Sequence, residues 1–128
     1  MTDENERLVS TKAGETLLLL GNEAIARGAI EAGVDLAATY PGTPASEIGL
    51  VLDAVAAVAG VKFQYAINEK VAMEVGAAAA IGGLKSLVFM KHVGMNVAAD
   101  ALMTLAYTGV RGAMVVVTAD DPGCHSSQ

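Results

Sequence analysis

The chain has 128 residues, which is the length of one domain and too short to split into two. Its formal net charge is −6, and its eight lysines and arginines are scattered singly, which argues against a nucleic-acid-binding surface. The longest uncharged stretch, residues 36–46, contains two prolines and is far shorter than the roughly 18 apolar residues of a membrane span. The acidic, polar beginning resembles no signal peptide, so we expect a cytoplasmic protein without membrane or nucleic-acid partners.

The sequence contains few residues that could bind a metal or take part in redox chemistry. Cys124 is the only cysteine, so the chain can form no internal disulfide and cannot by itself ligate an iron–sulfur cluster. The spacing of the two histidines and the acidic residues matches no known metal-binding pattern. We therefore expect no metal ligands in these 128 residues.

The first third of the chain begins with a charged segment and continues with segments whose apolar residues are regularly spaced. Residues 1–14 carry charge without periodicity and predict a flexible lead-in. The apolar run TLLLLG at residues 16–21 predicts a strand buried on both faces. Residues 22–33 have small and apolar residues at helical spacing, which predicts a helix that ends at Gly33. Residues 35–40 predict a second strand.

The rest of the chain repeats this alternation. After the loop YPGTP we expect a helix with Thr43 as its N-cap, Pro44 at its first position and Gly60 at its end. The alternating run VKFQYAI predicts a third strand at residues 61–67. The later elements are expected as a helix at 69–81, a strand at 85–90, a helix at 95–109 and a strand at 112–120.

The order β-α-β-α-β-α-β-α-β predicts an α/β fold, namely a doubly wound parallel sheet of about five strands with helices on both faces. In such folds ligands bind beyond the carboxyl ends of the strands. Polar residues, glycines and prolines gather in the loops at that edge, among them YPGTP, INE and KHVGMN. These loops are therefore the expected binding region.

Glu69 opens a helix that is otherwise mostly apolar. A carboxylate in the first turn is stabilised by the helix dipole by about 0.3–1 kcal/mol, and this structural role is common. The alternative is a carboxyl group that exchanges a proton with a ligand at the binding edge. Spacing alone favours the structural role. In the loop KHVGMN, Gly94 allows another group to come close to the backbone.

Three segments resemble a known family: GNEAIARGAIEAGVD, YPGTPASEI and the long run from NEKVAMEVG to the end of the chain. They are similar to the alpha subunits of the indolepyruvate:ferredoxin oxidoreductases, within the thiamine-diphosphate-dependent 2-oxoacid:ferredoxin oxidoreductase family. The resemblance covers residues 15–128. It implies a thiamine-diphosphate-binding fold, and specifically the domain that binds the aminopyrimidine ring of the cofactor.

The resemblance also implies a longer subunit. The family's segment for Mg²⁺ and diphosphate, with the pattern G-D-G…N, has no counterpart here. Its cysteine-rich region, which holds 4Fe-4S clusters, is missing too. We therefore expect the chain to be a fragment, inactive in isolation, with half a cofactor site and no electron carrier.

Family residues can be matched to this sequence one by one. In the family, a glutamate at the start of the helix after the third strand hydrogen-bonds N1′ of the aminopyrimidine, and the matching residue is Glu69. Glu74, farther along the same helix, is the weaker candidate. We also expect Gly94 and Asn96 to line the cofactor site.

The loop YPGTP matches the family's substrate-side loop, which implies that Thr43 lies near the 2-oxo acid. Relatives that act on pyruvate or 2-oxoglutarate have a bulky aliphatic residue where Gly42 stands, so the glycine suggests room for an aromatic side chain. Those relatives also have an arginine after the fifth strand that meets the substrate carboxylate. This chain has none there, and Lys91, His92 or His125 are the candidates to replace it.

As a whole, the resemblance implies oxidative decarboxylation of indolepyruvate or another aryl-pyruvate to the acyl-CoA. Coenzyme A and ferredoxin are then co-substrates, and a beta subunit is the partner. Two alternatives stay open. One is a paralogue that acts on another 2-oxo acid, and the other is a non-catalytic, truncated module for binding or assembly.

Overall fold

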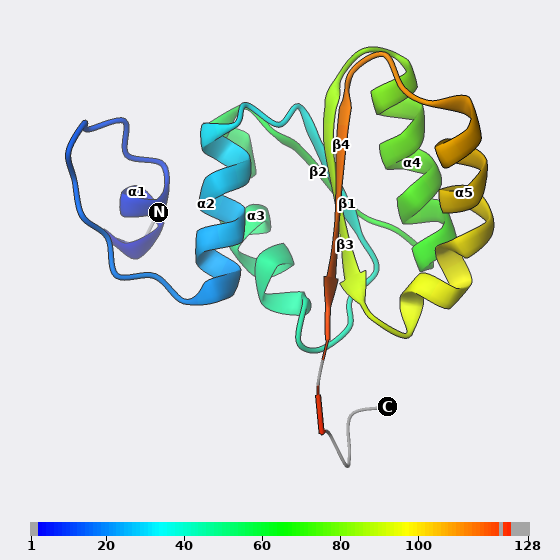
Figure 1. The fold of residues 1–128 in the computed structure, drawn as a ribbon. Coiled ribbons are helices and arrows are strands. Elements are labelled where there is room, and N and C mark those ends of the chain that lie inside the picture. Colours follow the sequence, from blue (N-terminus) through cyan, green and yellow to red (C-terminus); the bar gives the residue numbers. More distant parts are fainter. Residues whose placement is uncertain (1–2, 121, 124–128) are drawn as a thin grey trace.

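The computed structural model describes residues 3–120 and 122–123 and contains one parallel sheet (Figure 1). Its strands, in the spatial order β2-β1-β3-β4, are β1 (Leu36–Thr39), β2 (Lys62–Tyr65), β3 (Lys85–Lys91) and β4 (Ala113–Ala119). The helices that cover it are α2 (Gly21–Glu31) and α3 (Ser46–Ala59) on one face, with α4 (Glu69–Ile81) and α5 (Gly94–Thr108) on the other. The predicted doubly wound α/β fold is confirmed, with four strands in the described residues instead of about five.

Each face of the sheet has its own hydrophobic core. On the α2–α3 side, Phe89 of β3 packs with Ile48 and Leu52 of α3, all fully buried. On the α4–α5 side, Val88 of β3 packs with Met73 of α4. Because β3 lies inside the sheet with helices on both faces, all its residues after the first must be buried, which explains its continuous apolar sequence.

The strand predicted at residues 16–21 is absent, and that prediction is wrong. Leu18 and Leu20 are 94% and 68% exposed, and α2 begins at Gly21, the last residue of the predicted strand. The next strand along the chain, β1, pairs with β2 on one edge and with β3 on the other, so this segment could not have paired with it.

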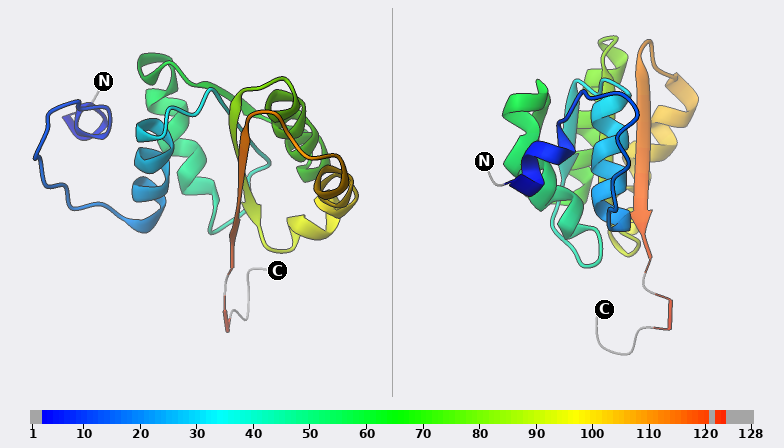
Figure 2. Two further views of the ribbon diagram at one scale, coloured as in Figure 1. Left: turned by 45° about the horizontal axis from the view of Figure 1, so that its top comes forward. Right: turned by 90° about the vertical axis from the view of Figure 1, so that its left-hand side faces the viewer.

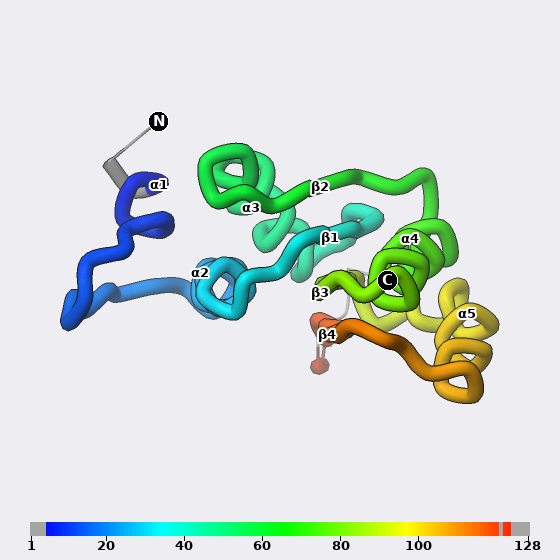
Figure 3. Tube along the Cα trace, turned by 90° about the horizontal axis from the view of Figure 1, so that it is seen from above, coloured from blue at the N-terminus to red at the C-terminus, as the bar shows by residue number. Residues whose placement is uncertain are grey.

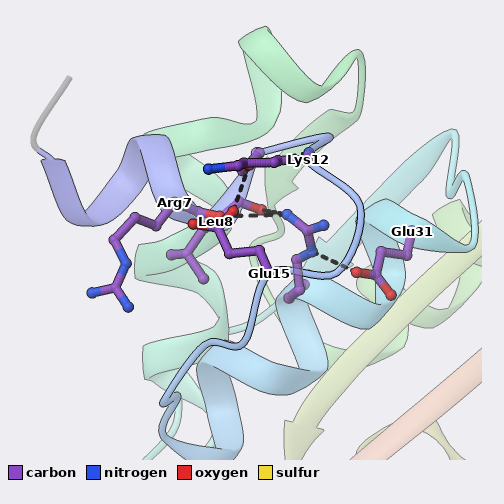
Figure 4. Close-up of polar contacts among 7 residues, drawn as sticks. Arg7, Leu8, Lys12, Glu15 and Glu31 are labelled. Atoms are coloured by element: carbon purple, nitrogen blue, oxygen red, sulfur yellow. Dashed lines mark hydrogen bonds and ion pairs between the residues drawn. The ribbon is translucent and has the colours of Figure 1, made fainter.

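Within the segment expected as a flexible lead-in, the structure contains a short helix, α1 (Asp3–Leu8). It lies outside the layer formed by α2 and α3, on the side away from α5 (Figures 2 and 3). The Leu8 side chain is buried. Arg27 of α2 holds the segment in place, because its Nη1 donates to the Leu8 carbonyl at 2.9 Å while its Nε contacts Glu31 at 2.7 Å (Figure 4).

Among the described residues, no helix combines the length and the apolar character that crossing a membrane would require.

Candidate functional site

The carboxyl ends of the four strands lie at one edge of the sheet, the lower edge in Figure 1. At this edge the backbone of Ala66, after β2, donates to the carbonyl of Thr39 at the end of β1 at 2.7 Å. On the other side, the backbone of His92, after β3, donates to the carbonyl of Ala119 at the end of β4 at 3.3 Å. The loops predicted to bind a ligand are therefore brought together side by side.

Glu69 is the first residue of α4, as predicted. The preceding residue, Asn68, has an extended backbone, and its side-chain Oδ1 accepts a hydrogen bond from the Val71 backbone at 2.9 Å. This cap satisfies one of the free N–H groups at the helix start and fixes where the helix begins. The half-buried Glu69 carboxylate thus stands in the first turn, where the helix dipole stabilises negative charge.

Glu69 lies directly against Gly94, the buried first residue of α5. A Cβ atom placed on Gly94 would fall 2.6 Å from both Cγ and Oε1 of Glu69. No pair of such atoms tolerates that distance, so the Glu69 side chain occupies the space that a residue-94 side chain would need. Two of the predicted cofactor-binding residues are therefore in contact.

One residue beyond Glu69, an ion pair joins the same two helices. Lys70 Nζ lies 2.8 Å from Oδ2 of Asp100, and 4.0 Å from Oε1 of Glu74. The hydrogen bond to Asp100, followed by the charges of Asp100 and Glu74, raises the pKa of Lys70. The hydrogen bond and charge of Lys70 lower the pKa of Asp100. Both groups are exposed to solvent, which screens their attraction.

Gly42 and Lys91 form a second contact at this edge. Lys91 is the last residue of β3 and is 9% exposed. A Cβ on Gly42 would lie 3.1 Å from Cβ of Lys91, so glycine at position 42 makes room for the aliphatic stem of Lys91. Whether Gly42 also leaves space for an aromatic substrate stays a prediction.

Thr43 does not cap the next helix, contrary to the prediction. Helix α3 begins at Ser46 with Ala45 as its N-cap, and the Thr43–Pro44 peptide bond is cis. The backbone of Ala45 turns back to the Gly42 carbonyl at 2.8 Å, which makes a turn where the sequence predicts the first turn of a helix. Thr43 itself is exposed at the edge.

The remaining predicted residues differ in their surroundings. His92 is half-buried, and its Nδ1 is buried without a hydrogen-bond partner among the described residues. Asn96 is exposed in the first turn of α5. His125 lies outside the described residues. Across the part of the chain that is described, no group of three or more histidine, cysteine, aspartate and glutamate side chains could hold a metal ion.

Two apolar residues at this edge escape the sequence reasoning. Ile67 directly precedes the Asn68 cap and is 82% exposed, and Tyr40 directly follows β1 and is 40% exposed. Tyr40 lies one residue beyond β1 and Ile67 two residues beyond β2, on neighbouring strands of the sheet. Their signal in the sequence is faint, because the strands predicted at residues 35–40 and 61–67 include both of them.

No protein-family model matches the chain. Curated relatives do match it, among them three that are each an indolepyruvate oxidoreductase subunit IorA. The protein from Methanothermobacter thermautotrophicus is 59% identical over 125 residues, which is 98% of this chain and 20% of that protein. The protein from Archaeoglobus fulgidus is 55% identical over 94% of this chain and 20% of its own length. The protein from Pyrococcus abyssi is 55% identical over 91% of this chain and 18% of its own length.

A solved structure has the same fold. It is the 2-oxoglutarate:ferredoxin oxidoreductase from Magnetococcus marinus with 2-oxoglutarate, coenzyme A and succinyl-CoA bound. The TM-score is 0.79 at 22% identity, over 87% of this chain and 19% of that one. The chain spans about a fifth of the length of the curated relatives it matches. The predicted resemblance is confirmed: over almost all of its length the chain is a relative of part of indolepyruvate oxidoreductase subunit IorA, and its fold is that of a 2-oxoacid:ferredoxin oxidoreductase domain.

Proposed function

We propose that the chain is the aminopyrimidine-binding part of a thiamine-diphosphate-dependent 2-oxoacid:ferredoxin oxidoreductase, with Glu69 as its catalytic carboxyl group. The observation that carries this proposal is the position of Glu69, half-buried at the start of α4 and in contact with Gly94 at the carboxyl edge of the sheet. An open parallel sheet binds its ligands at this edge. The similarity to IorA over 98% of the chain supports the same assignment.

The residues present fit the pyrimidine half of the cofactor. A carboxyl group can share a proton with a ring nitrogen, and the Glu69 carboxyl group at the binding edge makes no ion pair or hydrogen bond with the described residues. Gly94 leaves the space in which that side chain lies, and Asn96 adds an exposed amide two residues farther on. When bound, thiamine diphosphate supplies the carbon nucleophile for the 2-oxo acid. The Mg²⁺ and diphosphate contacts, like the 4Fe-4S clusters, belong in this proposal to other parts of the complete enzyme.

Glu69 would act as a proton partner. Its Oε atom holds a proton in one state and accepts a hydrogen bond from N1′ in the other, so the carboxyl group controls the protonation of the aminopyrimidine. The Asn68 cap fixes where the helix begins and with it the backbone position of Glu69.

We propose indolepyruvate or another aryl-pyruvate as the substrate, with the acyl-CoA and reduced ferredoxin as products. The names of the relatives support this choice. The exposed residues Tyr40 and Ile67 offer aromatic and aliphatic surface at the same edge of the sheet as Glu69, which suits an aryl side chain. A paralogue acting on another 2-oxo acid is the alternative, since the structural neighbour binds 2-oxoglutarate.

The substrate carboxylate needs a cation or a hydrogen-bond donor in place of the family arginine. Lys91 supplies a charge at the end of β3, and the following residue, His92, carries a buried Nδ1 that no described residue pairs. Thr43 is exposed on the neighbouring loop. We assign Lys91 and His92 to the carboxylate and Thr43 to the 2-oxo group side of the pocket; His125 would join them as a residue outside the described part. In this proposal the protein works in the cytoplasm, with a beta subunit as its partner and ferredoxin as its electron acceptor.

A different function, as a non-catalytic assembly module, is favoured by one observation. In the segment before α2, Leu18 is almost fully exposed and Leu20 is largely exposed, as on a surface that another chain covers. The two functions separate in one experiment, because an assembly module does not depend on the carboxyl group of Glu69.

That experiment compares Glu69→Gln with Glu74→Gln in the complete oxidoreductase. Both glutamates lie on α4, and Glu74 is exposed. We expect Glu69→Gln to reduce ferredoxin reduction by indolepyruvate by about 100-fold or more, the usual contribution of a positioned acid or base. Glu74→Gln should retain nearly normal activity. Wild-type activity in a correctly folded Glu69→Gln enzyme would refute the proposal.

A further inference from the structure

The contact between Gly94 and Glu69 raises the question of why position 94 is glycine. Glycine is required where the backbone has a positive φ, but Gly94 is not among the positive-φ glycines of this chain. The remaining reason is space. A Cβ at this position would lie 2.6 Å from Cγ and Oε1 of Glu69, and 2.9 Å from its Cδ. The atoms in the way are thus those of the carboxyl group itself.

The two residues cannot easily separate, because the helices that carry them are fixed at this end. Lys70, next to Glu69, is paired with Asp100 of α5. Behind them, buried Met73 of α4 and buried Ala98 of α5 belong to one hydrophobic cluster with β3. A side chain at position 94 would therefore move the flexible partner, the Glu69 side chain, before it moved either helix.

The direction of that movement matters. The Glu69 carboxyl is half-buried where Gly94 stands, and a methyl group in that space would force its χ angles toward another rotamer and toward solvent. A carboxyl oxygen that must meet one ring nitrogen has to be placed within a fraction of an ångström. Space at position 94 is thus a condition for the orientation of the acid as well as for packing.

We infer that Gly94 is a positioning residue for Glu69: the missing side chain at the start of α5 leaves the space that sets the direction of the Glu69 carboxyl group. This inference rests on the proposed function, in which that carboxyl meets the aminopyrimidine. Gly94 itself touches no reacting atom in it and acts through Glu69.

The chain offers a matched control. Gly21 is the first residue of α2, as Gly94 is of α5, and a Cβ on Gly21 would meet nothing within 4 Å. Gly21→Ala and Gly94→Ala therefore make the same chemical change at the same helical position, and only the second meets a carboxylate. Glu69→Ala removes the obstructed group and completes a double-mutant cycle with Gly94→Ala.

The first measurement uses the full natural chain without cofactor. We expect Gly94→Ala to raise the unfolding equilibrium constant in urea about 3- to 10-fold, because the Glu69 side chain must leave its rotamer. In a Glu69→Ala background the same change should alter that constant by less than about twofold, since the clash is gone. Should Gly94→Ala fail to fold, the double variant must fold as Glu69→Ala does. An equal effect in both backgrounds, or a double variant that also fails to fold, overturns the inference.

The second measurement follows the acid directly. The carboxyl ¹³C resonance of Glu69 should shift in Gly94→Ala and stay in place in Gly21→Ala. In the complete enzyme, kcat should then fall about 100-fold in Gly94→Ala with KM for the 2-oxo acid little changed, which is the expected cost of a misplaced catalytic group. An unshifted resonance or an unchanged kcat overturns the positioning role. The coupling and the resonance are read without thiamine diphosphate, so they stand or fall separately from the activity of Glu69→Gln.

Discussion

Gly76 of α4 and Val88 of β3 approach so closely that a Cβ on Gly76 would lie 2.3 Å from Cγ2 of Val88. Both residues are buried, and the neighbouring Ser86 hydroxyl donates to the Gly76 carbonyl at 2.9 Å. Helix α4 is therefore held directly on the sheet, with backbone against side chain. This close packing of α4 on the sheet positions Glu69, the first residue of the helix, at the carboxyl edge.

Gly76→Ala should destabilise the protein by about 1–3 kcal/mol, the usual cost of overpacking a core. Gly28→Ala, inside α2, is the control, because a Cβ there meets nothing within 4 Å. That control should be neutral or more stable by roughly 0.5–1 kcal/mol, since alanine favours helix over glycine. Urea unfolding of the two variants checks the prediction, and equal effects would contradict it.

The ion pair between Lys70 and Asp100 should make a small, pH-dependent contribution to the free energy of unfolding. The pKa of Asp100 is lowered from 3.8, so its contribution is present above 3.8 and is lost as the pH falls through the lowered value. The pKa of Lys70 is raised from 10.5, so its contribution is present below 10.5 and is lost as the pH rises through the raised value.

Asp100→Asn should therefore lower the urea midpoint slightly between these two limits and flatten the acid side of the profile. At 1 M salt, where charges are screened beyond about 3 Å, the difference from wild type should shrink. A difference that is the same at pH 7 and at pH 2 would show that the substitution acts by something other than this pair.

Lys91→Met tests the assignment of the substrate carboxylate. Loss of a hydrogen bond from a charged group costs about 1.5–3 kcal/mol, so KM for the 2-oxo acid should rise roughly 10- to 100-fold. Because the carboxylate is bound in ground and transition states alike, kcat should change little. Lys62→Met, at the exposed start of β2, is the control. An unchanged KM would transfer the role to His92.

Arg27→Ala should loosen the N-terminal segment. The guanidinium Nη1 is the donor to the Leu8 carbonyl, and nearby the Ser10 hydroxyl donates to Glu15 at 2.8 Å (Figure 4). Without Arg27, a protease should cut residues 9–20 faster than in wild type, while the global urea midpoint changes less. Arg111→Ala, an exposed arginine before β4, should leave the cleavage rate unchanged.

Much of the fold follows from local pattern. Helix α4 is predicted at its observed bounds, because polar Asn68 caps its start and Gly82 and Gly83 end it. Strands β3 and β4 are predicted within one residue at each end. Both are apolar runs, and β3 is buried as a central parallel strand should be, whereas β4 lies at the edge of the sheet and is only partly buried.

The errors have a common cause. A local sequence pattern does not tell which other segment of the chain an element will contact. TLLLLG has the composition of a buried strand, but β1 has no free edge for it. Threonine and proline often begin a helix, but here Thr43 and Pro44 lie in the turn that the hydrogen bond to the Gly42 carbonyl closes. Glycine marks a close approach in the sequence, and only the structure tells that Lys91 approaches Gly42 and Glu69 approaches Gly94.

The central pairing of the sheet has a consequence for how the chain folds as it is made. Thr39 of β1 and Phe89 of β3 are partners in register, and they are 50 residues apart in the chain. At a synthesis rate of about 5–20 residues per second, the inner edge of β1 waits roughly 3–10 seconds for its partner. For about the first half of that time β2 is not yet made either, and afterwards β1 has only β2 beside it, so an apolar strand edge stays available to ribosome-bound chaperones and to other nascent chains.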